Sequence, residues 1–237
     1  MALVRRRVAA AGTSAGLVVL ISLLLIGCGD LGSGLDNTPG SSPATSSPTT
    51  PVAVATGASG PVVGPGPQSS YHVQAQPAPG TCHYVVLDAA TGQYLPDPHC
   101  TPGATNPRVT QADLALTICK SGYTATIRPP ESITEPEKRA SEAAYDLTGK
   151  SSTTEYDHLI SLELGGDPNS PLNLWPEPNK ADAAGVTNPK DGVENTLRKL
   201  VCDAVHGKPY LPLAKAQYLI STNWTTAIAT AQKDLVG

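Results

Sequence analysis

The chain has 237 residues, with 16 Lys and Arg against 20 Asp and Glu and a formal net charge of −4. This length accommodates one ordinary domain plus appendages. A protein that binds nucleic acid tightly through charge usually has an excess of basic residues, so the composition disfavours that class. The 23 prolines and 22 glycines indicate that part of the chain is low in complexity.

Residues 1–28 have the pattern of an export signal. Three arginines at 5–7 precede an apolar stretch at 17–26, which is too short for a comfortable membrane span. The stretch ends in Leu-Ile-Gly-Cys at 25–28 and resembles the lipobox of bacterial lipoproteins, whose cysteine is acylated. The resemblance implies an extracytoplasmic chain, lipid-anchored at Cys28 to the outer face of the cell membrane. The alternative is an ordinary signal peptide with a chance cysteine.

Residues 29–80 are expected to be a disordered linker. Ser, Thr, Pro, Gly, Ala and Val dominate this stretch, and no Lys, Arg, Asp or Glu lies between Asp36 and Asp88. Such a sequence buries too little apolar surface to offset the entropy of ordering it. Its predicted role is to hold the following domain away from the membrane.

Residues 81–237 have the length of one folded domain and contain four cysteines. An even number of cysteines in an exported chain indicates disulfides. Cys82 and Cys100 flank a hairpin-like piece, which favours pairing them, and Cys119 then pairs with Cys202 by default. A zinc site is the alternative, but no two of these cysteines have the short C-x-x-C spacing.

The first half of this domain mixes short strands and helices. Residues 83–95 predict a hairpin turning at Ala-Thr-Gly, and Thr110 is typical of the N-cap of a short helix. Residues 122–127 alternate like a strand or extended arm before two prolines. A capping-box pattern at 134–137 predicts a helix that ends near Gly149.

The second half is organised around residues 154–178. A half-buried strand is predicted over 153–164, followed by a Gly-Gly turn and a short return strand at 173–175. Asn188 and the proline after it are typical of a helix start. Two further amphipathic helices are predicted over 213–220 and 224–235, so the predicted fold class is α+β.

The central stretch resembles a known family. Asp157-His158, the run through Gly165-Gly166, and Asn173-Leu174 look like the opening of the HNH nuclease motif of the ββα-metal fold. The wider context, including Asn-Leu-Trp-Pro at 173–176, is similar to exported bacterial HNH-like proteins. The resemblance implies a ββα-metal (HNH-like) core over 81–237, with additional packing helices and an N-terminal hairpin.

The resemblance also implies roles for individual residues. His158 becomes the general base that takes a proton from water, and Asp157 a ligand of one divalent cation. Asn173 orients the loop that carries the histidine. The family has a third site residue on its helix, and Glu194 and Asn195 rank ahead of the other candidates here, which are Asn179, Asn188 and Lys190. The implied cofactor is Mg²⁺, Mn²⁺ or Zn²⁺, and the implied partner is nucleic acid, with no protein partner inferable.

Two function classes remain from the sequence. The first is a surface-tethered, metal-dependent nuclease acting on extracellular nucleic acid. The second is a catalytically silent binding or structural domain that keeps the same fold. Residues 81–237 contain 13 Lys and Arg against 18 Asp and Glu. This acidic balance opposes tight non-specific binding to DNA and favours the second class.

Overall fold

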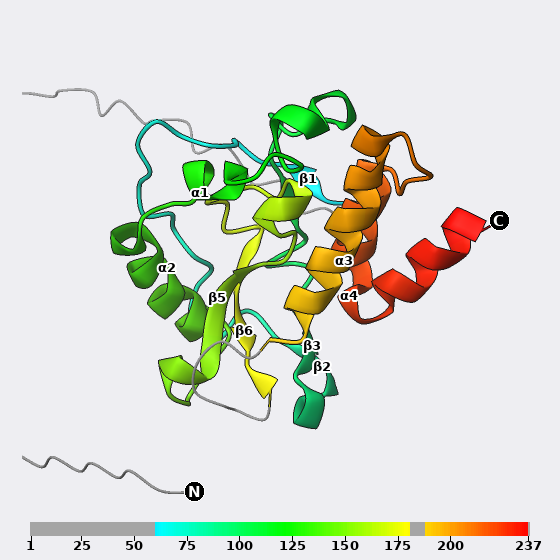
Figure 1. Ribbon diagram of the computed structural model, residues 1–237. Coiled ribbons are helices and arrows are strands. Elements are labelled where there is room, and N and C mark those ends of the chain that lie inside the picture. Colours follow the sequence, from blue (N-terminus) through cyan, green and yellow to red (C-terminus); the bar gives the residue numbers. More distant parts are fainter. Residues whose placement is uncertain (1–59, 181–187, 237) are drawn as a thin grey trace, which may run out of the picture. The chain divides into compact units, whose positions relative to one another are not determined.

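The structure is a computed structural model that describes residues 60–180 and 188–236 (Figure 1). The expected signal segment 1–28, with Cys28, and the first part of the expected linker lie outside the described residues. The described residues form a mixed α+β arrangement of small sheets and helices, which confirms the predicted fold class.

Short strands and helices alternate along the chain. The strands are β1 (Val62–Val63), β2 (Val85–Asp88), β3 (Gln93–Leu95), β4 (Ala104–Thr105), β5 (Thr154–His158) and β6 (Leu174–Pro178). The α-helices are α1 (Tyr123–Ile127), α2 (Glu131–Ala144), α3 (Lys190–Cys202) and α4 (Leu213–Val236). Turns of 3₁₀ helix span Ala89–Thr91, Gln111–Leu116, Ser151–Thr153, Leu162–Leu164 and Asp203–His206. Within the described residues the strands pair as three two-stranded sheets, namely β1 with β4 in parallel and β2 with β3 and β5 with β6 antiparallel.

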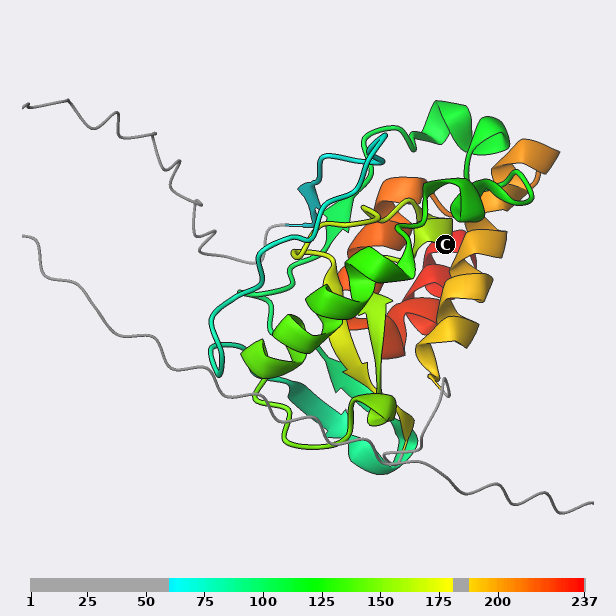
Figure 2. The same ribbon diagram turned by 90° about the vertical axis from the view of Figure 1, so that its left-hand side faces the viewer.

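The β5–β6 sheet lies at the centre of the fold. Its register runs from Thr154 opposite Pro178 to His158 opposite Leu174. Helix α2 lies on one side of this sheet, and α3 packs with α4 on the other (Figures 1 and 2). The element order β5, β6, α3 therefore places the end of a strand beside the first turns of a helix.

The predicted strand over 153–164 is too long, because β5 ends at His158. Leu162–Leu164 instead form a 3₁₀ turn, and Gly165 continues from it with φ of 74°. A Cβ at Gly166 would lie 1.7 Å from the carbonyl oxygen of Ile160. The two glycines thus allow a tight turn that no bulkier pair could form.

The return strand is longer than predicted, because β6 continues through both prolines to Pro178. Proline lacks a backbone N–H and is tolerated where that side of the strand needs no partner. In a two-stranded sheet each strand has one unpaired edge, so Pro176 and Pro178 fit in β6.

Two predictions in the first half of the domain are wrong. Residues 122–127 were predicted as a strand or extended arm, but Tyr123–Ile127 form α1 after Gly122 in a left-handed conformation. Alternation over so few residues does not separate a strand from a helix turn. Helix α2 begins earlier than the capping box at 134–137, directly after Pro130, and ends at Ala144 instead of near Gly149.

Residues 60–80 belong to the folded unit, so the expected linker boundary at residue 80 is wrong. Val62 and Val63 pair with β4, and the Gly66 N–H donates to Asp167 Oδ2 over 2.6 Å. The Tyr71 hydroxyl donates to the Ile127 carbonyl over 2.6 Å. Composition predicts disorder from a lack of apolar burial, but backbone hydrogen bonds fix this segment instead.

Both predicted disulfides are confirmed. Cys82 pairs with Cys100 across the β2–β3 hairpin, and Cys119 pairs with Cys202 at the end of α3. Disulfides persist in oxidising compartments, so they are consistent with an extracytoplasmic domain. Over residues 60–180 and 188–236 no helix has the length and apolar character needed to span a bilayer.

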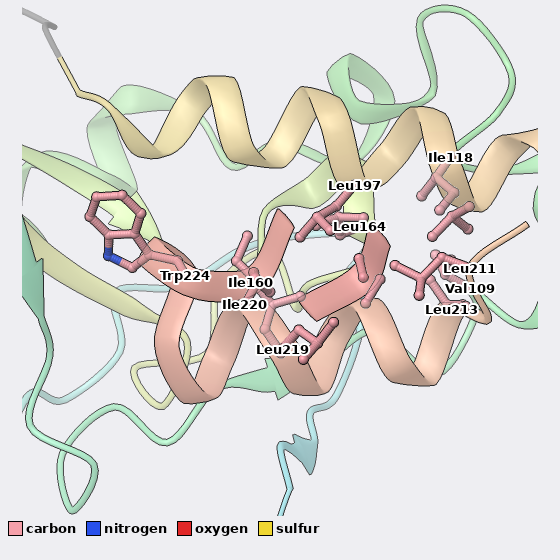
Figure 3. Close-up of a cluster of buried hydrophobic side chains, with 14 of the residues drawn as sticks. Val109, Ile118, Ile160, Leu164, Leu197, Leu211, Leu213, Leu219, Ile220 and Trp224 are labelled. Carbon is pink, nitrogen blue, oxygen red and sulfur yellow. The ribbon is translucent and has the colours of Figure 1, made fainter. Parts of the chain in front are cut away.

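The main hydrophobic core lies between α3 and α4 (Figure 3). Leu197 from α3 and Ile220 from α4 are fully buried there, together with Ile160 and Leu164 from the turn after β5. Non-helical backbone at Asn223 divides α4 into two segments, as the sequence predicts. The core therefore fixes α3 against the segment that follows His158.

Candidate active site

The predicted site residues converge on one pocket of about 280 Å³. Asp157 and His158 reach it from the end of β5, and Glu194 and Asn195 reach it from α3. The remaining lining residues are Thr124, Arg128, Ser161, Leu162, Glu163 and Asp191. The structure thus brings together four of the five residues predicted for the nuclease site.

His158 is held in one tautomer at the wall of this pocket. Its side chain is buried, and Nε2 lies 3.1 Å from the Pro168 carbonyl oxygen. A carbonyl only accepts hydrogen bonds, so Nε2 carries the proton and Nδ1 keeps its lone pair. Burial lowers the pKa of His158 to about 4, and the nearby Arg128 and Lys190 charges act in the same direction. The imidazole is therefore neutral at pH 7.

Asn173, the fifth predicted residue, lies behind the pocket and braces the segment after His158. Its Oδ1 accepts from the backbone N–H groups of Ile160 (3.0 Å) and Ala104 (3.2 Å). Its Nδ2 donates to the carbonyl oxygens of Ile160 and Asp167, each over 3.0 Å. The fully buried amide thus uses all its hydrogen-bonding capacity within the fold.

Lys190 joins the two predicted carboxylate ligands. Its ammonium forms ion pairs with both Asp157 and Glu194, and it donates to the His158 carbonyl oxygen over 3.0 Å. A third carboxyl oxygen, Glu177 Oε2, lies 3.6 Å from the same nitrogen. Lys190 is fully buried, at the first turn of α3. Three acidic side chains therefore surround one buried ammonium.

Burial and the ammonium together set the protonation of this cluster. Burial works to raise the pKa of Asp157, but the Lys190 charge outweighs it and holds that pKa below its ordinary value. Burial raises the pKa of Glu177 well above its ordinary value, and it raises that of Glu194 to about 8 against the opposing Lys190 charge. At pH 7 the Asp157 carboxylate and the Lys190 ammonium therefore balance each other, beside a mainly protonated Glu194.

The residues in this arrangement do not fit a resident divalent metal. Asp157 and Glu194 both hold the ammonium, so a cation between them would have to displace Lys190. Asn195, the other predicted ligand, is exposed and its Nδ2 donates to the Asp191 carbonyl oxygen over 2.8 Å. Across the described ranges no group of three or more His, Cys, Asp and Glu side chains is placed to hold a metal ion.

Arg128 and Glu177 contribute to the site but were not assigned a role from the sequence, and Lys190 was only a lower-ranked candidate for the third site position. The spacing of Lys190 and Glu194, one helical turn apart, was the available signal for that pair. Glu177 is buried on β6 opposite Glu155, a position that its proline-rich surroundings conceal. Arg128 is exposed at the pocket, where it supplies a positive charge next to the neutral histidine.

Comparison with known proteins returned no match: no family model fits the chain, and no curated protein or solved structure is similar to it. Any functional conclusion therefore depends on the geometry of the site.

Glu155→Gln is expected to stabilise the protein at alkaline pH. Burial raises the pKa of Glu155 to about 7, with the Asp157 charge adding to it, and Oε2 has no hydrogen-bond partner in the part of the chain that the structure describes. Because the folded pKa exceeds the unfolded one, the folded state holds the proton between about pH 4.5 and 7, and stability falls as pH rises through that window. Removing the group should add about 1–3 kcal/mol at pH 8 and little at pH 4.5.

Urea denaturation of the variant and the parent at both pH values measures this difference. Glu135→Gln, at an exposed position on α2, serves as the control. Equal stabilities of Glu155→Gln and the parent at pH 8 would show that the carboxyl ionises freely in the folded protein.

Proposed function

We propose that this domain hydrolyses phosphodiester bonds of extracellular nucleic acid, as an HNH-like nuclease held at the cell surface. The observation that carries the proposal is the neutral His158, whose Nε2–H is bound by the Pro168 carbonyl and whose Nδ1 has no hydrogen-bond partner among the described residues. The order β5, β6, α3 around this histidine also supports the HNH-like ββα assignment.

The pocket offers groups suited to a phosphate. Arg128 supplies an exposed guanidinium, which can pair with phosphate oxygens through charge-assisted hydrogen bonds. Ser161 also lines the pocket, but its hydroxyl oxygen is buried. Arg128 is therefore the group that binds and orients the phosphodiester beside His158.

The reaction adds one water molecule across a P–O bond. His158 Nδ1 takes a proton from the water as its oxygen bonds to phosphorus, and the bond to the leaving ester oxygen breaks. That oxygen takes a proton from solvent, and the imidazolium returns its proton to solvent. The products are a phosphomonoester and an alcohol. The low pKa of His158 keeps the base available across the neutral range.

The second candidate, a catalytically silent binding or structural domain, is supported by one observation. The buried Lys190 satisfies Asp157 and Glu194, so the acidic residues are stably paired without any reaction partner. A structural role for this cluster requires no substrate. The two candidates differ in whether the free Nδ1 of His158 does chemistry.

Cleavage of supercoiled plasmid DNA and of a structured RNA by the disulfide-bonded protein tests the proposal. We expect slow nicking, because the acidic chain binds the phosphate backbone only weakly. The nicking should weaken further with added salt, which screens the remaining charge contacts. Assays run with chelator and with Mg²⁺, Mn²⁺ or Zn²⁺ cover the implied cofactors. Intact substrates under all of these conditions would favour the silent domain.

The lipid anchor at Cys28 is part of the same proposal. Cys28→Ser is expected to move the protein from the membrane fraction to the soluble fraction, or to leave its signal segment uncleaved. Cell fractionation and intact-mass analysis of the mature chain measure both effects. A wild-type protein that carries no lipid at Cys28 would contradict the anchor.

A further inference from the structure

We infer that the Lys190 ammonium takes the place of a divalent cation in this site, so that the wild-type protein holds its carboxylates without a metal ion. This inference deepens the proposed function, on which its meaning for catalysis rests. Whether a side chain fills the cation position can be tested without any cleavage assay.

The contacts of Lys190 support the inference directly. The ammonium pairs with Asp157 from β5 and with Glu194 from its own helix, and the Glu177 carboxyl on β6 lies 3.6 Å away. Carboxyl oxygens from β5, β6 and α3 thus surround one point. A side-chain ammonium already occupies that point.

Two further observations show that the cluster is built around this charge. Lys190 is fully buried, although its aliphatic stem and charged head usually reach solvent. The fully buried Glu177 lies beside this ammonium, and the Asp157 and Asn188 side chains also interact with its carboxyl. The Lys190 charge therefore contributes to offsetting the burial of Glu177.

The position of the ammonium also explains how the pocket can accept a phosphate. Asp157 and Glu194 line the pocket, and without a compensating charge the ionised Asp157 carboxylate would repel a phosphodiester. Lys190 does not line the pocket itself. It is therefore a positioning residue that neutralises the acidic wall and holds the end of β5 through the His158 carbonyl.

Lys190→Ala tests this role, because it removes the ammonium and leaves room for an ion. The variant should gain one Mn²⁺ site in isothermal titration calorimetry. Mn²⁺ at about 100 times its dissociation constant should raise its melting temperature by roughly 5–10 °C. Adding Asp157→Asn to the variant should abolish this site. The wild-type protein should show no saturable Mn²⁺ binding below millimolar concentrations.

Two matched variants separate charge from packing. Lys190→Met removes the charge but fills the space, so it should gain no Mn²⁺ site. Lys199→Ala removes an exposed lysine from the same helix and should behave like the wild type. If Lys190 only fills space and does not replace a cation, Lys190→Ala should gain no Mn²⁺ site.

The wild-type titration decides the inference even if Lys190→Ala fails to fold. Stoichiometric Mn²⁺ binding by the wild type that Asp157→Asn abolishes would overturn it, and so would a folded Lys190→Ala without a Mn²⁺ site. Absence of wild-type binding, or a variant that refolds only with Mn²⁺, supports it. Failure of the nuclease proposal is recognised separately, as intact DNA and RNA alongside a Mn²⁺ site gained by Lys190→Ala.

Discussion

Replacing His158 by alanine is expected to reduce phosphodiester cleavage by about 100- to 10,000-fold, the range that general acid–base catalysis contributes. The substitution removes the group whose Nδ1 accepts the proton from water. Rates measured with the same substrate at saturating and limiting concentrations should show the loss in kcat, because His158 contributes to the reaction more than to binding.

His206→Ala provides the matched control, because His206 is an exposed histidine at the end of the 3₁₀ turn after α3. Purified in the same way, it should cleave at the wild-type rate. Equal rates for His158→Ala and the wild type would remove His158 from the mechanism and point to a contaminating activity.

The pH dependence of the wild-type rate follows from the same histidine. Burial lowers the pKa of His158 to about 4, so the base is protonated only in acid. The same low pKa affects the free energy of unfolding. Between about pH 4 and 6.5 the unfolded state binds more protons than the folded state, so His158 lowers stability as pH falls through that window. The acid limb of the rate profile should lie near pH 4 instead of near 6.5.

Asn173→Ala is expected to lower the free energy of unfolding by about 4 kcal/mol or more. It leaves four buried backbone groups without partners, and each such group costs about 1–3 kcal/mol. Urea denaturation monitored by circular dichroism measures the loss. Per folded molecule, cleavage should fall less than in His158→Ala, because Asn173 does not line the pocket.

Asn195→Ala is the control for this prediction. Asn195 is exposed and its hydrogen bond is local to α3, so its loss should change stability by about 0.5 kcal/mol or less. A loss below about 1 kcal/mol for Asn173→Ala would mean that water or neighbouring groups satisfy the freed backbone.

Local patterns in the sequence predicted several features correctly. The hairpin between Cys82 and Cys100 and the start of α3 after Asn188 depend on turn and capping residues close in sequence, so they could be predicted from the chain alone. Asp157 and His158 could be placed beside α3 because strand, turn, strand and helix follow one another directly.

Long-range contacts were the part that sequence patterns did not predict. Lys190 contacts Asp157, which is 33 positions away in the sequence. The Lys190 side chain points inward because of how α3 packs on the core, and this packing depends on residues far apart in the sequence. The order of segment 60–80 depends on backbone hydrogen bonds to distant residues. The segment therefore has no apolar pattern from which its order could be predicted. α1 is too short for either periodicity to be recognised.

Chemical rescue of His158→Ala by imidazole tests the role of His158 most directly. We expect added imidazole to restore cleavage by the variant and to leave the wild-type rate unchanged. The rescued rate should rise with pH as imidazole loses its proton near the ordinary histidine pKa of about 6.5. Full cleavage by the variant without imidazole, or a folded variant that stays inactive at every imidazole concentration while the wild type cleaves, would contradict the assignment of His158 as the base.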